Sequence, residues 1–323
     1  MRLRVSLIAA TLTFVMWLTP AWAEQFLFRT AANPDGKLGA LSRPPNAQVE
    51  TETADDFPLT TTTVISRAVI TGLIVPTGSS PVNISRVEVE VYHIFSRDSD
   101  ATRTINVPTR VNSPSDVEIP TATRDSLDRT LSFSSTLLDG SFTVTNSVVN
   151  NIFPKPNQTT HGEGPKTGEE VAITINFTTP LILQAGHFFF RPEVEVSGGN
   201  FLWLSAPKPI LSDGTPFPAA VADLQAWIRN ADLKPDWLRI GTDIIGIIPP
   251  ATTAPTFNMT FSLAGDTVPD AGTPERPNCH GKTISALAHQ FGGIAAAAST
   301  LGASNVPALQ QAVDLYCALV TFD

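Results

Sequence analysis

Apolar and polar residues alternate along most of residues 24–264. In the stretch RVEVEVYHIF the alternating positions are Val87, Val89 and Val91 on one face and Glu88 and Glu90 on the other. A period of two is that of a β-strand with one face in a core and one in water. The same alternation recurs in EEVAITINF, SFTVTNSVV and TFNMTFSL, with turn-forming stretches such as PTGSSP and PKPNQ between them. We therefore predict a mainly β domain over 24–264, an antiparallel β-sandwich of jelly-roll type.

One stretch within this domain has a helical period instead. In PAAVADLQAWIRNADLKPDWLRIG the apolar residues at helical spacing are Val221, Leu224, Trp227 and Ile228. The later Pro235 would stop such a helix, because proline has no N–H to donate. We predict a helical insertion at about 218–241, before the last strand of the domain.

The pattern becomes helical again after a linker predicted at 265–278. Ile284, Leu287, Ala288 and Phe291 recur at the spacing of one helix face, and Gly292 would end that helix. A second helix of the same kind would end at Gly302, and Ser304 or Asn305 would cap a third. The expected apolar positions of the third helix are Val306, Leu309, Val313 and Tyr316. We predict a small α-helical module over 279–323.

The only two cysteines of the chain, Cys279 and Cys317, bracket this module. In an oxidising compartment such a pair predicts a disulfide, which would close a loop worth about 4 kcal/mol. A zinc site with His280 and His289 fits poorly, because adjacent ligands such as Cys279 and His280 are unusual in structural zinc sites. A redox role is disfavoured because the Cys-x-x-Cys spacing is missing, and an intermolecular bond is the remaining alternative.

The first 23 residues have the pattern of a signal peptide. Arg2 and Arg4 precede a short apolar run, and Ala21-Trp22-Ala23 is a small-x-small cleavage site. An uncleaved anchor is the alternative, but the run is short for a membrane span. Removing Arg2 and Arg4 leaves 19 basic against 30 acidic residues, a net charge of −11. Such a chain is a poor partner for nucleic acid, and no later segment is long and apolar enough to span a bilayer. We expect an exported protein, periplasmic or extracellular.

Candidate catalytic chemistry is sparse. The sequence contains no H-E-x-x-H, G-x-S-x-G, P-loop or dinucleotide-binding motif. His161 and Glu163 lie in a Gly/Pro-rich loop, where they are either exposed loop residues or part of a loop-borne site that includes Asp213. Paired glutamates on single strands, such as Glu88 with Glu90 and Glu193 with Glu195, resemble acid pairs of glycosidases. We interpret them instead as the solvated face of a half-exposed sheet, and we assign no catalytic residue.

Two sets of residues are candidate binding sites. Asp55, Asp56, Asp98 and Asp100 lie near predicted strand ends, where loop carboxylates commonly bind calcium. We therefore consider a structural calcium ion, and no other cofactor. Trp203 and Trp237 are either core residues or exposed platforms on which a sugar ring can stack. Trp227 lies on the apolar face of the expected helix, so we place it in the core.

Two stretches, TADDFPLTTTTVISRAVITGLIV and ISRVEVEVYHIF, carry a resemblance to known proteins. Over roughly 50–95 the chain resembles bacterial secreted β-sandwich proteins of uncharacterised function, in which an Ala-Asp-Asp-Phe segment precedes the first core strands. The resemblance implies a bacterial exported protein and no particular activity. TVPDAG at 267–272 is similar to the start of a C-terminal sorting signal of some of these proteins, but no membrane helix or basic end follows it here.

These observations favour an exported, non-catalytic protein of the cell envelope or extracellular space that acts by binding, with glycan as a candidate ligand, or as a structural component. A secreted hydrolase with a loop-borne active site is one alternative. The other is an envelope component that docks an envelope protein through its helical tail.

Overall fold

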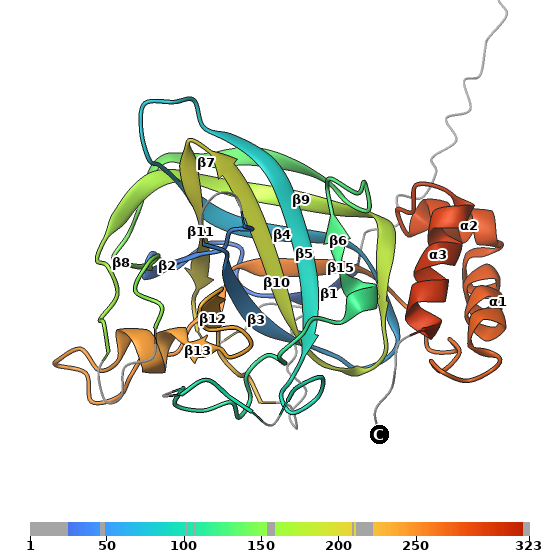
Figure 1. The fold of residues 1–323 in the computed structure, drawn as a ribbon. Helices are drawn as coiled ribbons and strands as arrows, with labels where there is room; N and C mark the ends of the chain where they lie inside the picture. Colours follow the sequence, from blue (N-terminus) through green and yellow to red (C-terminus); the bar gives the residue numbers. More distant parts are fainter. Residues whose placement is uncertain are drawn as a thin grey trace, which may run out of the picture.

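The computed structural model describes residues 25–45, 49–100, 102–105, 107–153, 159–208, 210 and 222–318 of the 323-residue chain. The predicted signal peptide (1–23) and Asp213 lie outside the described residues. In the described part the chain is mainly β, with two sheets and a helical C-terminal segment at one end of them (Figure 1).

The larger sheet contains nine strands among the described residues. Its strands are β1 (Gln25–Arg29), β2 (Leu38–Leu41), β4 (Thr63–Pro76), β7 (Ser132–Val144), β8 (Asn146–Val148), β9 (Lys166–Leu183), β11 (Gly199–Ala206), β14 (Asn258–Met259) and β15 (Phe261–Thr267). The long strand β4 pairs with β9 on one side and with β15 and β11 on the other. Strand β7 continues the sheet beyond β9. The pairing of β2 with β8 is parallel, and the other pairings of this sheet in the described residues are antiparallel.

The smaller sheet contains six strands in the described part of the chain, and each of its pairings is antiparallel. In spatial order they are β13 (Leu238–Arg239), β12 (Trp227–Asn230), β3 (Thr51–Leu59), β10 (Gly186–Ser197), β5 (Asn83–His93) and β6 (Arg124–Asp125). A short 3-10 helix (Pro120–Ala122) precedes β6, and a π-helical turn (Ile240–Ile245) follows β13.

Aromatic side chains join the two sheets face to face. Phe190 of β10 stacks on Phe261 of β15, with ring centroids 5.3 Å apart, and Phe57 of β3 lies 6.3 Å from Phe28 of β1. These rings belong to one large core that also contains the alternating valines of β5. On β5 the period of two found in the sequence therefore separates the inner face of the strand from its outer face.

The predicted helical insertion at 218–241 is wrong where the structure describes it. Residues 227–230 and 238–239 form strands β12 and β13, with the π-helical turn directly after them. Ile228 points into the core between the sheets, while Trp227 is buried in a second apolar cluster on the opposite face. Because β12 is covered on both faces, it lacks the alternation of a half-exposed strand and is easily confused with part of a helix.

The C-terminal helices agree with the sequence pattern. They are α1 (Cys279–Phe291), α2 (Ile294–Thr300) and α3 (Val306–Cys317). Gly292 ends α1 with a left-handed backbone (φ 75°), which glycine adopts without steric cost. The side chain of Asn305 caps α3 by accepting a hydrogen bond from the N–H of Ala308 at 2.8 Å. None of the helices in the described residues is long and apolar enough to cross a membrane.

The helical tail is packed on the larger sheet. Helix α3 contacts β9, and Leu309, Val313 and Tyr316 belong to the same core as the strands. The N–H of Ser304 also donates to the carbonyl of Thr178, at 3.0 Å. The predicted linker begins later than expected, because Gly265, Asp266 and Thr267 still pair with β4 as part of β15. Backbone pairing continues there without any apolar alternation in the side chains.

Candidate functional site

The most concentrated group of ionisable side chains lies on the outer face of the smaller sheet. On β5 the valines point into the core, so Glu88, Glu90 and Tyr92 point away from it. The register of β5 with β10 places Arg191 opposite Glu90 and Glu193 opposite Glu88. We expected this face to be solvated, and that interpretation is wrong for its central residues, because Glu90, Arg191 and Glu193 are buried.

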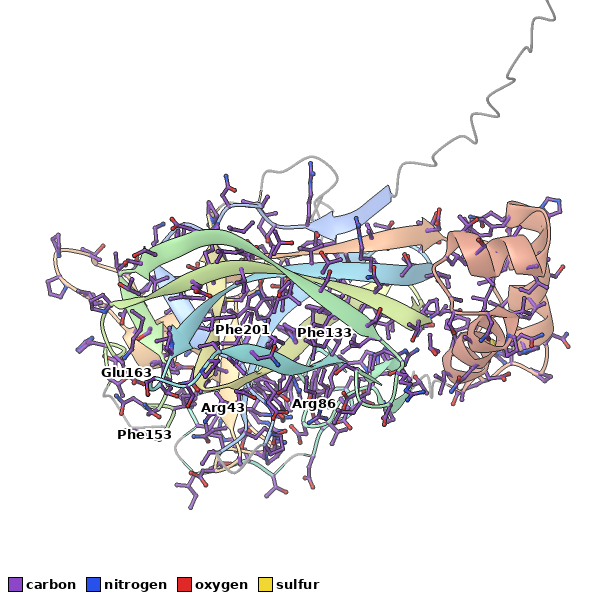
Figure 2. The ribbon with its side chains drawn as sticks, turned by 90° about the horizontal axis from the view of Figure 1, so that it is seen from above. Arg43, Arg86, Phe133, Phe153, Glu163 and Phe201 are labelled. Atoms are coloured by element: carbon purple, nitrogen blue, oxygen red, sulfur yellow. A yellow bond between two sulfur atoms is a disulfide. The ribbon has the colours of Figure 1, made fainter. Side chains whose placement is uncertain are left out.

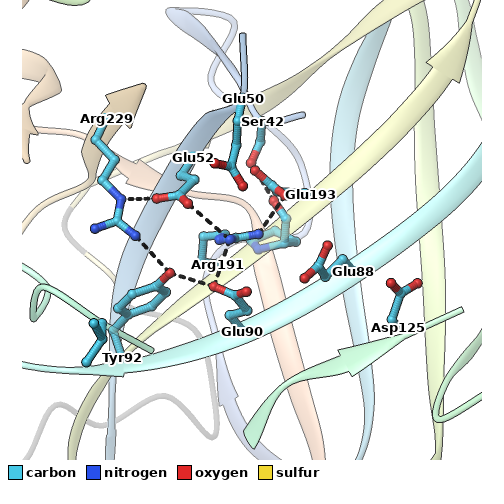
Figure 3. Close-up of polar contacts among 12 residues, drawn as sticks. Ser42, Glu50, Glu52, Glu88, Glu90, Tyr92, Asp125, Arg191, Glu193 and Arg229 are labelled. Carbon is cyan, nitrogen blue, oxygen red and sulfur yellow. Dashed lines mark hydrogen bonds and ion pairs between the residues drawn. The ribbon is translucent and has the colours of Figure 1, made fainter. Parts of the chain in front are cut away.

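Arg191 is the centre of this group, which we call the ion-pair cluster (Figure 3). One terminal nitrogen, Nη2, lies 2.7 Å from Oε2 of Glu90 and 3.2 Å from Oε1 of Glu52. The other, Nη1, lies 2.7 Å from Oε2 of Glu193. One guanidinium thus joins carboxylates from β3, β5 and β10, which is possible because a planar fork presents donors in several directions.

Arg229 extends the cluster from β12. It lies directly opposite Glu52 in the register with β3, and its Nε pairs with Oε2 of that residue. Its Nη2 donates to the hydroxyl of Tyr92 at 3.1 Å, and that hydroxyl donates to Oε2 of Glu90 at 2.5 Å. Lys234 approaches from the solvent side, with Nζ 2.5 Å from Oε2 of Glu50 and 2.9 Å from Oε1 of Glu52. The cluster, defined by these and the previous contacts, is Glu50, Glu52, Glu90, Tyr92, Arg191, Glu193, Arg229 and Lys234.

Two segments cover the cluster, one that contains Asp116 and one that contains Pro235 and Asp236. The Nη1 of Arg229 donates to the carbonyls of Asp116 (2.9 Å) and Pro235 (3.1 Å), one from each segment. Arg110 joins the same two segments, because it pairs with Asp116 and with Asp236, the latter at 2.8 Å between Nε and Oδ1. The cover explains why charged residues of an outer sheet face are not in water.

The surroundings of the cluster shift the pKa values of Glu52 and Glu193 in opposite directions. Burial acts to raise the pKa of Glu52, but the positive charges of Arg191 and Arg229 lower this pKa to about 2. Burial, reinforced by the charges of Glu52 and Glu50, raises the pKa of Glu193 well above its usual range despite Arg191. Glu52 is therefore ionised at neutral pH, whereas burial and the neighbouring carboxylates favour the protonated form of Glu193.

Glu88 lies at the margin of the cluster beside Arg86, at 2.7 Å between Oε2 and Nη2. Burial is the main cause that raises its pKa to about 7, with a further contribution from Glu90. A carboxyl that titrates near neutral pH is the chemical requirement for a general acid. Arg86 also pairs with Asp125 at 2.5 Å, so the margin is bonded to β6 as well.

The two candidate tryptophans are both core residues. Trp203 of β11 is fully buried between the sheets, where its Nε1 donates to the carbonyl of Thr260 at 2.8 Å. Trp237 is 1% exposed, and its Nε1 donates to the carbonyl of Ser115 at 3.1 Å. Neither ring presents a face to solvent, so the expectation of exposed stacking platforms is wrong. Each indole has enough apolar surface to be buried once its single N–H is satisfied.

The four candidate calcium ligands do not meet. Asp55 points into the core between the sheets and accepts the N–H of Met259 at 2.7 Å, while Asp56 on the opposite face pairs with His187 at 2.6 Å. Asp98 pairs with His93, and Asp100 accepts the N–H and hydroxyl of Thr102, both at 2.8 Å. Neighbours on a strand point to opposite faces, which is why Asp55 and Asp56 are separated.

His161 and Glu163 are bonded to backbone groups, so both side chains hold the loops around them in place. Oε1 of Glu163 accepts the N–H groups of Val149 (2.9 Å), Asn150 (2.5 Å) and Asn151 (3.1 Å). Partial burial opposes these bonds, but together they lower the pKa of Glu163. Nδ1 of His161 lies 2.9 Å from the carbonyl of Ile245. Glu163 lies toward the end of the molecule opposite the helical tail (Figure 2).

The predicted disulfide is present between Cys279 and Cys317, with Cα atoms 5.7 Å apart. Both sulfur atoms are thereby used, so the zinc arrangement with His280 and His289 does not form. His280 instead lies 3.3 Å from the carboxylate of Asp314 on the surface of the tail.

Sequence reasoning missed Arg191, Arg229 and Glu52. One signal was available: in GHFFFRPEVEV an arginine follows three phenylalanines on a strand, where the opposite strand supplies glutamates. A buried arginine needs acceptors for its N–H groups, and carboxylates are the strongest of them. A comparison of the chain with protein-family models, curated proteins and solved structures found no match.

Proposed function

We propose that the chain is an exported, non-catalytic protein that acts by binding a partner or as a structural component of the cell envelope or extracellular space. The observation that carries this proposal is the ion-pair cluster: its carboxylates are bonded to its own arginines beneath a cover. Charges bound to one another in this way stabilise a unique arrangement of strands and are poorly placed to move protons to a substrate.

Three further observations support export. The N-terminal pattern and the resemblance over 50–95 both favour a secreted bacterial protein. The disulfide is consistent with an oxidising compartment.

We also retain the jelly-roll type as an interpretation of the topology, since consecutive strands β3, β4 and β5, and again β9, β10 and β11, alternate between the two sheets.

The binding version of the proposal does not include stacking of glycans on Trp203 or Trp237, because both rings are buried. The hydrolase alternative is weakened in the same way, because Glu163 is bonded to three backbone N–H groups of its own loop. We therefore propose a protein partner or an assembly role ahead of a sugar ligand.

Fractionation of a bacterium that expresses the full chain tests the export part. We expect the chain to be recovered outside the cytoplasm, and we expect a thiol-alkylating reagent to modify Cys279 and Cys317 only after reduction. Recovery in the cytoplasm with both thiols reactive would contradict it.

A panel of polysaccharide, peptide and ester substrates tests the non-catalytic part. We expect no turnover that depends on the cluster. Turnover by the wild type that is lost in Glu88→Gln, while the fold is kept, would show that the carboxyl with the pKa of about 7 is catalytic.

A further inference from the structure

Three carboxylates converge at the solvent side of the ion-pair cluster. The ligand oxygens of Glu50, Glu52 and Glu193 all lie within 4.8 Å of one another, and they form the only such group of acidic, histidine or cysteine side chains in the described residues. Glu50 directly precedes β3, Glu52 lies in β3, and Glu193 lies in the neighbouring strand β10. Two of the three side chains are buried, and Glu50 is only partly covered.

A second observation, on Glu193, also favours a cation ligand for this group. Its side chain is fully buried, and its Oε1 has no hydrogen-bond partner among the described residues. A buried carboxylate oxygen without a partner is costly, because it loses its bonds to water and gains none in exchange. One of the two carboxylate oxygens of Glu193 lies within 4.8 Å of carboxylate oxygens of Glu50 and Glu52.

Carboxyl groups outnumber the buried guanidinium groups in the cluster. Four carboxylates (Glu50, Glu52, Glu90 and Glu193) face two buried guanidinium groups (Arg191 and Arg229). Lys234 supplies one more positive charge. Its side chain is 39% exposed and reaches the group from solvent, so it is the cation that can leave most easily.

We propose that Glu50, Glu52 and Glu193 bind one divalent cation of the calcium type, and that Lys234 occupies its place when the cation is absent. Three carboxylates offer oxygen ligands alone, which calcium prefers, and water can complete the roughly six to eight ligands of this ion. The partly covered Glu50 leaves a path from solvent.

Calcium titration of the full chain after treatment with a chelator tests this inference, which does not depend on the proposed function. Calorimetry should show saturable binding, and the temperature of unfolding should rise with calcium concentration. Lys234→Gln removes the competing charge and should lower the Kd about tenfold or more. Glu193→Gln and Glu50→Gln should each abolish the calcium effect. Glu195→Gln, two residues along the same strand and outside the group, should bind calcium as the wild type does.

Two results would overturn the proposal. One is the lack of heat and of a thermal shift at millimolar calcium in both the wild type and Lys234→Gln. The other is equal calcium stabilisation of the wild type, Glu193→Gln and Glu50→Gln, which would indicate non-specific binding to an acidic surface. If Glu193→Gln fails to fold, Glu50→Gln decides, because its side chain is partly exposed and its loss opens no cavity in the core.

Discussion

The guanidinium carbon of Arg229 lies 4.2 Å from the centroid of the Trp237 ring. Tyr92 stands against the same ring edge to face, with centroids 5.4 Å apart. Trp237 therefore forms the apolar cover of a charged cluster, and its hydrogen bond to Ser115 connects the two covering segments. A cation over an aromatic ring is stabilised by the ring quadrupole, more so when both groups are out of water.

Replacing Trp237 with alanine should destabilise the chain by about 3–5 kcal/mol. The substitution leaves a large cavity and admits water to Arg229. Trp237→Phe, which keeps an aromatic face but loses the N–H, should cost clearly less. Chemical denaturation followed by circular dichroism measures both values. A loss below about 1 kcal/mol in Trp237→Ala would mean that the cover does not depend on this ring.

The strands and the helical tail could largely be predicted from the sequence, because their signals are local. The alternation of Val87, Val89 and Val91 gave the inner face of β5, and the disulfide between Cys279 and Cys317 followed from cysteine number and compartment. The strand β12 could not be recognised, since its residues are buried on both faces.

The ion-pair cluster was missed for a different reason. The cover of this sheet face includes Asp116 and Pro235, whose carbonyls bond Arg229 and which are distant in sequence from Glu90 and Glu193. Burial of Trp203 and Trp237 likewise depends on what packs over them. Local sequence patterns indicate which face of an element a residue occupies, whereas tertiary packing decides whether that face is exposed to solvent.

Asp55 predicts a distinct pH dependence of stability. It shares the core face of β3 with Phe57, and burial, followed by the charge of Asp56, raises its pKa well above the usual range. A carboxyl with a raised pKa in the folded state stabilises the fold fully below the pKa of the unfolded chain, about 4. That contribution is lost as the pH rises toward the pKa of the folded chain.

The variant Asp55→Asn should remove this dependence. Its free energy of unfolding should fall less than that of the wild type as the pH rises from about 4 upward. Denaturation series at several pH values make the comparison, with Asp270→Asn, an exposed position, as the control. If the free energies of unfolding of the wild type and Asp55→Asn differ by an amount that stays constant with pH, Asp55 is ionised in the folded chain.

Loss of the disulfide should loosen the tail first. The chain-entropy estimate for the 38-residue separation of Cys279 and Cys317 is about 4 kcal/mol. Packing of Leu309 and Val313 in the common core should still hold α3 on β9. We expect the double variant Cys279→Ser, Cys317→Ser to be cut in the tail by a protease well before the strands are cut. Equal cleavage of the wild type and the variant would show that packing alone closes the tail.

Buried ion pairs hold the outer face of the smaller sheet together, and a double-mutant cycle between Arg229 and Glu52 measures the strength of one of them. Arg229→Met and Glu52→Gln should each cost about 3–5 kcal/mol, because each leaves a buried charge without its partner. The double variant should cost less than the sum, with a coupling of about 2 kcal/mol or more between the two residues. Additive losses in the free energy of unfolding would contradict the claim, because they would mean that the two side chains do not stabilise each other.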